Sequence, residues 1–119
     1  MRNMSCQLTK AQVLDGTKDV TRRLGWAGLR RRDLVQLCEK CQGLKKGEAP
    51  VKLRVIRVKS VRREPLSRML DYPDYGRREC KREGFPHLSP EQFVAFFVAT
   101  HSGATRGTIV TRIEWVYES

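Results

Sequence analysis

The sequence lacks long hydrophobic runs, internal repeats and low-complexity linkers. Its longest uninterrupted apolar run covers residues 93–99, seven residues, whereas a membrane-spanning helix needs roughly 20. No basic segment followed by an apolar one opens the chain, so no secretion signal is expected. We therefore expect a soluble, cytoplasmic protein that contacts no membrane. A chain of 119 residues builds one hydrophobic core, which predicts a single domain over 1–119.

Metal-ligating side chains are also scarce. The chain has two histidines and four cysteines, and Cys38 and Cys41 form its single C-x-x-C pair. A structural zinc site needs four ligands, and no second pair is present. The surrounding residues alternate like a strand, which would turn the two thiols toward opposite faces. We therefore expect free thiols, no bound zinc and no cofactor.

Acidic residues are few compared with basic ones. Lys and Arg number 24 against 13 Asp and Glu, and the net charge is +11. Residues 1–68 hold 18 basic and 6 acidic side chains, whereas residues 69–119 are nearly neutral. Sixteen of the basic residues are Arg, which favours bidentate contact with phosphate or carboxylate. The basic N-terminal half is thus a candidate RNA-binding surface, and a solvated basic surface without a specific partner is the alternative.

The hydrophobic pattern predicts a mixed α+β fold. Alternation favours strands, and capping residues with a helical stripe favour helices. The expected strands are 4–8, 33–39, 51–61 and 108–117, and the expected helices are 10–15, 65–70 and 90–100. The alternation over 51–61 changes phase near Ile56, which indicates a bulge there. Residues 71–85 are expected to form an irregular loop with a helical middle. So many strands in a short chain predict a small mixed β-barrel with short flanking helices.

A group of polar residues follows the predicted helix end at Gly16. Lys18 and Thr21 lie three residues apart, so they meet on one side only if the segment turns. An amine beside a hydroxyl is a pairing that activates a poor nucleophile, because the amine can take the hydroxyl proton. The same residues could instead grip a phosphate, or Lys18 could be an ordinary surface residue.

The segment Gly16-x-Lys18-x-x-Thr21-x-Arg23 resembles the G-x-K-x-x-T-x-R signature of ASCH domains, which are related to PUA domains. The resemblance extends to the strands in DLVQLCEKC, VKLRVIRVKSV and TRIEWVYE. It implies a small β-barrel with one of two functions. Many ASCH domains are thought to bind RNA. Some small single-domain members resemble amidohydrolases that remove acyl groups from the exocyclic amine of cytosine, as in N4-acetylcytidine.

The resemblance implies catalytic roles for Lys18 and Thr21, acting with a downstream Glu that precedes a helix. Glu83 matches that position best, and Glu79 is the weaker candidate. Thr21 would attack the acyl carbonyl, Lys18 would take its proton, and Glu83 would protonate the leaving amine. Water as the nucleophile is compatible with the same residues. Glu83 in a structural ion pair with a neighbouring basic residue is the alternative.

Three further residues are expected to bind the substrate. Arg23 belongs to the motif, and Trp26 and Phe85 follow the catalytic candidates closely in the chain. Either aromatic ring could stack on a pyrimidine, and packing in the core is the alternative for both. The other phenylalanines and Trp115 are assigned to the core. The expected function is therefore metal-independent hydrolysis of N4-acylated cytosine nucleosides, with a non-catalytic RNA-binding module as the alternative.

Overall fold

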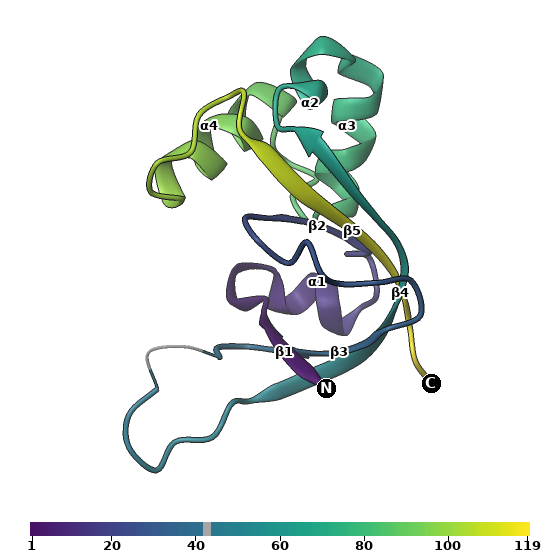
Figure 1. The fold of residues 1–119 in the computed structure, drawn as a ribbon, viewed down its shortest axis with the longest axis vertical. Coiled ribbons are helices and arrows are strands. Elements are labelled where there is room, and N and C mark those ends of the chain that lie inside the picture. Colours follow the sequence, from purple (N-terminus) through teal and green to yellow (C-terminus); the bar gives the residue numbers. More distant parts are fainter. Residues whose placement is uncertain (42–43) are drawn as a thin grey trace.

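The computed structural model describes residues 1–41 and 44–119. It has an α+β fold in which five strands form one strongly curled, half-barrel sheet with short helices around it (Figure 1). The strands are β1 (Arg2–Ser5), β2 (Val20–Arg23), β3 (Leu34–Cys38), β4 (Lys52–Pro65) and β5 (Ile109–Tyr117). The helices are α1 (Lys10–Leu14), α2 (Arg68–Asp71), α3 (Pro73–Arg82) and α4 (Pro90–Thr100), and a 3₁₀ turn covers Gln7–Thr9. None of these helices is both long and apolar enough to cross a bilayer.

The strand order is β1-β3-β4-β5-β2, with β1 parallel to β3 and the other pairs antiparallel. The long strand β4 carries two irregularities, one opposite Leu37 and Cys38 of β3 and one between Val58 and Ser60 where it pairs with β5. The irregularities expected in this strand are therefore present, but they lie on either side of Ile56, which itself stays in register and is fully buried. Extra residues in one strand increase its bend and twist, which suits a sheet that curls this strongly.

The apolar residues gather in two clusters along the sheet. The first fills the curl of the sheet beside α1, and the second lies under α2, α3 and α4. In Figure 1, β4 and β5 run from the lower part of the molecule to the group of three helices. The first cluster includes Met4, Val13, Leu37, Ile56 and Trp115, and the second includes Leu66, Met69, Phe93, Phe97 and Val110. The buried polar and charged side chains belong to neither cluster.

In the middle of the chain one expectation is wrong, and the other, an irregular loop with a helical middle over 71–85, is right only in its helical middle. Pro65 ends β4 instead of opening a helix, and α2 begins only at Arg68. Most of residues 71–85 form the regular helix α3, which starts with Pro73 at its first turn. The inward stripe of α3 includes the buried charge of Glu79 beside Cys80, so an analysis based on apolar periodicity finds no helical face there.

The two ends of the chain are closer to expectation. Helix α4 has the predicted Ser89 N-cap, completed by a capping box with Gln92. Strand β5 covers the predicted closing strand to within one residue. Near the N-terminus, the expected strand 4–8 is displaced, because β1 ends at Ser5 and the 3₁₀ turn follows. Gly16 ends the first helical segment with φ of 82°, the left-handed conformation that was expected there.

Candidate active site

A cavity of about 180 Å³ opens beside the start of β2, large compared with the roughly 10–15 Å³ that a cavity needs to hold one water molecule. Its walls come from the 3₁₀ turn, β2, the end of α3 and one side of α4. The three expected catalytic residues line it together, and so do two of the three expected substrate-binding residues: Lys18, Thr21, Glu83, Arg23 and Phe85. The chain therefore brings most of the predicted site to one place.

Lys18 lies just before β2 and is 2% exposed. Its Nζ donates to the carbonyl oxygens of Val20 at 2.9 Å and Glu83 at 2.6 Å, and it lies 3.4 Å from Glu83 Oε1. The same amine lies 5.8 Å from the centroid of the Trp115 ring. Burial lowers the pKa of Lys18, against the opposing effect of the Glu83 charge. The lowered pKa favours the neutral amine, which is the form that accepts a proton.

Glu83 is placed by the end of α3. Gly84 follows with φ of 95°, and the amides of Gly84 and Phe85 bond back to Lys81 O at 3.1 Å and Cys80 O at 2.9 Å. This pair of backbone hydrogen bonds is typical of a helix that ends with a glycine in the left-handed conformation. Glu83 thus lies at the last turn of α3, not in a loop, and it is 3% exposed.

Both carboxylate oxygens of Glu83 contact cations. Oε1 faces Lys18 Nζ, and Oε2 accepts a hydrogen bond from Arg22 Nη1 at 3.1 Å. The sequence suggested an ion pair between Glu83 and a neighbouring basic residue of α3, but Glu83 contacts Lys18 and Arg22 instead. A carboxylate held from both sides has a fixed orientation, which is what a group that exchanges protons with a substrate requires.

Thr21 is the second residue of β2 and is 3% exposed. Its Oγ1 accepts a hydrogen bond from Arg23 Nε at 3.1 Å, and Arg23 Nη2 donates to Ser5 O at 2.6 Å. The Thr21 hydroxyl is therefore oriented through an accepted bond, while its own hydrogen stays available for a base or a substrate. Arg23 holds the hydroxyl in place and fastens β2 to the end of β1.

Glu79, the weaker candidate for the acid, lies outside the cavity lining. It is 2% exposed and contacts Arg22 at 2.6 Å and Arg112 at 2.5 and 3.1 Å. Burial would raise its pKa, but the hydrogen bonds and charges of Arg112 and Arg22 outweigh burial and lower the pKa to about 2. A carboxyl group that stays ionised cannot donate a proton near neutral pH, so Glu79 is unsuited to that role.

The cavity has an aromatic wall that sequence analysis missed. Phe93, Phe96 and Phe97 of α4 line it with Phe85, and the Phe85 ring lies 5.9 Å from Phe93 and 5.7 Å from Phe96. These residues were assigned to the core, but their i, i+3 and i+4 spacing also puts them on one side of a helix that faces the cavity. His101 joins them, stacked on Phe97 with ring centroids 3.8 Å apart.

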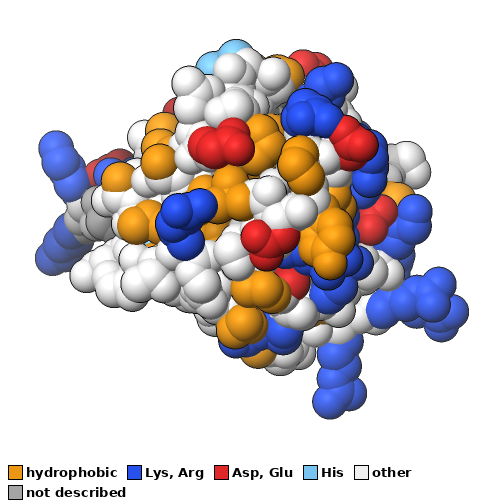
Figure 2. All heavy atoms as spheres, turned by 90° about the horizontal axis from the view of Figure 1, so that it is seen from above, with side chains coloured by type: hydrophobic (Ala, Val, Ile, Leu, Met, Phe, Trp, Pro, Cys, Tyr) orange, Lys and Arg blue, Asp and Glu red, His pale blue; other side chains and the backbone are white. Residues whose placement is uncertain are grey.

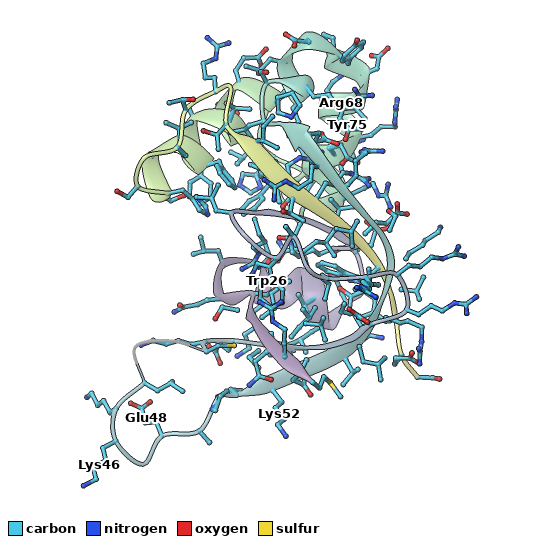
Figure 3. All side chains as sticks on the ribbon, in the orientation of Figure 1. Trp26, Lys46, Glu48, Lys52, Arg68 and Tyr75 are labelled. Carbon is cyan, nitrogen blue, oxygen red and sulfur yellow. The ribbon has the colours of Figure 1, made fainter. Side chains whose placement is uncertain are left out.

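The structure does not bring Trp26 to this cavity. Trp26 packs against the sheet cluster, and the Arg2 guanidinium lies 3.7 Å from its ring centroid. Figure 3 shows it among the N-terminal elements, far from the labelled Tyr75 at the helical end. Trp26 has φ of 58° in the turn after β2, and this turn directs it away from the site despite its closeness in sequence.

All four cysteines are free thiols, and Cys6 lines the cavity. Burial raises the pKa of Cys6, which keeps it protonated and weakly nucleophilic. Within residues 1–41 and 44–119, no three His, Cys, Asp or Glu side chains are grouped so that they could hold one metal ion.

The depressed pKa of Glu79 predicts a pH-dependent contribution to stability. Its folded pKa of about 2 lies below the ordinary value of 4.5, so the stabilisation is complete above 4.5 and is lost as the pH falls toward 2. We expect Glu79→Gln to lower the free energy of unfolding by about 3 kcal/mol at pH 7. The difference from the wild type should shrink steadily between pH 4.5 and pH 2, as measured by urea unfolding. A difference independent of pH over this range would contradict the assignment.

No protein-family model and no curated protein matches this chain. Solved structures with the same fold include the crystal structure of hypothetical protein PH0355, with a TM-score of 0.63 and 15% identity over 98% of this chain and 96% of that one. The crystal structure of protein EF3133 from Enterococcus faecalis V583, described with the family DUF984, has a TM-score of 0.59 and 12% identity. This match covers 98% of this chain and 78% of that one. These similarities establish a shared half-barrel fold.

Proposed function

We propose that this protein is a metal-independent amidohydrolase that removes the acyl group from N4-acylated cytosine nucleosides, and that it is a PUA-like domain of the ASCH type. The observation that carries the proposal is the meeting of Lys18, Thr21 and Glu83 in one cavity, with the amine and the carboxylate 3.4 Å apart. These side chains supply a base, a nucleophile and an acid for amide hydrolysis. The signature around Gly16 supports the family assignment.

The reactive state is the neutral pair, with an amine at Lys18 and a carboxyl group at Glu83. Thr21 Oγ1 bonds to the acyl carbon while Lys18 takes the hydroxyl proton. The C–N4 bond then breaks as Glu83 gives its proton to the departing amine, which leaves as cytidine. Water next attacks the acyl-threonine ester and gives its proton to Glu83. Lys18 returns its proton to the Thr21 oxygen as the acid leaves, and both groups are restored.

The lining of the cavity suits such a substrate. Its lining combines the polar side chains of Lys18, Thr21 and Arg23 with the aromatic wall from Phe85 and α4. An acylated pyrimidine is flat and largely apolar, with an amide at one edge. It can stack on aromatic side chains while the amide meets the polar side chains.

The direct test is to incubate the purified protein with N4-acetylcytidine and follow the release of cytidine by chromatography. We expect turnover that is unchanged by prior treatment with EDTA, because the proposed base, nucleophile and acid are all side chains. Complete loss of activity with EDTA, restored by a divalent metal ion, would contradict the metal-independent mechanism. The absence of turnover with any N4-acylated cytosine would contradict the proposed function.

Binding of RNA is the second candidate function, favoured by the exposed positive charge. Figure 2 shows Lys and Arg side chains projecting around the edge of one face, with apolar and acidic side chains between them. Figure 3 shows Lys46 at the tip of the segment between β3 and β4, away from the body of the molecule. Arg68, whose guanidinium lies 5.1 Å from the Tyr72 ring centroid, adds a cationic and aromatic surface. Such surfaces attract polyanions without requiring the cavity.

A further inference from the structure

Arg22 is one of the most completely buried charged residues in the described part of the chain. Its side chain is 0% exposed, although it comes from β2 between Thr21 and Arg23. Its guanidinium contacts three carboxylates, those of Glu83, Glu79 and Glu64, at 3.1, 2.6 and 3.4 Å. Arg22 Nη2, the nitrogen that contacts Glu79 and Glu64, also lies 3.0 Å from the Tyr75 hydroxyl. A buried guanidinium with so many acceptors orders several elements at once.

Three of these partners form a single stripe on α3. Tyr75, Glu79 and Glu83 follow each other at intervals of four residues, which places them on one side of the helix. Arg22 faces this stripe, so it connects β2 directly to the helix that carries Glu83. The position of Glu83 relative to Thr21 therefore depends on a contact made by the residue next to Thr21.

The three carboxylates differ in how many other cations they contact besides Arg22. Glu79 keeps a two-bond contact with Arg112, and Glu64 keeps a contact with Arg62 Nε at 2.8 Å. The other cation that Glu83 contacts is Lys18, at 3.4 Å. If Lys18 becomes a neutral amine during the reaction, as proposed above, Arg22 is the cation that remains on Glu83.

We propose that Arg22 is a positioning residue that holds Oε2 of Glu83, so that Oε1 alone exchanges protons with the leaving amine and the attacking water. This inference rests on the proposed amidohydrolase function and adds a residue to it. A guanidinium suits the task because it stays protonated and its fixed geometry reaches Glu83 and Glu79 through different nitrogens. A lysine offers a single nitrogen and cannot hold both carboxylates in the same way.

The test compares Arg22→Lys with Arg112→Lys. Arg112 is the matched control, since it is also a buried arginine on Glu79 but has no contact with Glu83. We expect Arg22→Lys to lower kcat for N4-acetylcytidine by about 100-fold, the effect of a catalytic group displaced by roughly 1 Å, with KM unchanged. Arg112→Lys should keep kcat near the wild-type value, even if it lowers the melting temperature as much as Arg22→Lys does.

The outcomes separate the two proposals. A wild-type protein without activity overturns the proposed function, and the role of Arg22 with it. An active wild type in which both variants lose kcat equally overturns the role of Arg22 alone, as does a loss that appears only in KM. If Arg22→Lys does not fold, the double variant Arg22→Met with Glu64→Gln removes one charge of each sign and keeps the volume. The same 100-fold loss of kcat is then expected, and kcat equal to the wild type overturns the proposal.

Discussion

Replacing Thr21 by Val is expected to lower kcat for N4-acetylcytidine by at least about 1,000-fold, because the substitution keeps the shape of the side chain and removes the attacking oxygen. Lys18→Ala should have an effect of the same size, since it removes the base. Thr17→Val is the matched control: Thr17 is exposed in the same segment, and its hydroxyl bonds to Asp15, an exposed residue outside the cavity. Its activity should equal that of the wild type.

The same variants distinguish catalysis from a phosphate grip. If Lys18 binds RNA phosphate, Lys18→Ala should weaken RNA binding and reduce the salt dependence by roughly one unit of slope, whereas Thr21→Val should matter little. The observed burial of Lys18, with its amine directed at two carbonyl oxygens and Glu83, leaves little of its charge for a phosphate. We therefore expect both variants to bind RNA nearly as the wild type does. A protein that binds RNA tightly and hydrolyses no acylated cytosine would establish the binding module instead.

Gly76→Ala should destabilise the protein by about 3 kcal/mol, although alanine is the better helix former by roughly 1 kcal/mol. A Cβ at Gly76 would lie 2.1 Å from the backbone oxygen of Met69 and 2.9 Å from a Pro90 side-chain carbon. Backbone cannot move aside as a flexible side chain does, so α3 must shift away from α2 and α4. Urea unfolding measures the loss.

Because α3 carries Glu83, the shift should also lower kcat for N4-acetylcytidine. Gly28→Ala is the control, since a Cβ there meets no atom within 4 Å. Its stability should stay close to that of the wild type. Equal stability of the Gly76→Ala variant and the wild type would contradict the expected clash. An unchanged kcat in a destabilised variant would show that the close packing of α3 is not needed to position Glu83.

The sequence alone predicted those structural elements whose physical cause lies within a few neighbouring residues. The capping box at Ser89 and Gln92 fixes the start of α4 within four residues of chain, and the alternation of β5 comes from one strand with a buried face. The left-handed Gly16 ends the first helical segment as expected, and Lys18 and Thr21 a few residues later both line one cavity. Such features depend on neighbours a few residues apart, which periodicity and capping rules describe directly.

The tertiary structure alone decided the surroundings of those residues. Helix α3 is stabilised by contacts of its polar stripe with Arg22 of β2, which is far away in the sequence. The apolar residues of this segment therefore show no helical periodicity from which α3 could be predicted. Trp26 was expected in the site because it follows the motif, but the turn after β2 carries it to the sheet cluster, while phenylalanines of α4 form the cavity wall. A buried ion network and a cavity wall both depend on how distant segments pack. The charge pattern of the chain specifies which groups need partners, and the curl of the sheet against α3 and α4 specifies which partners they receive.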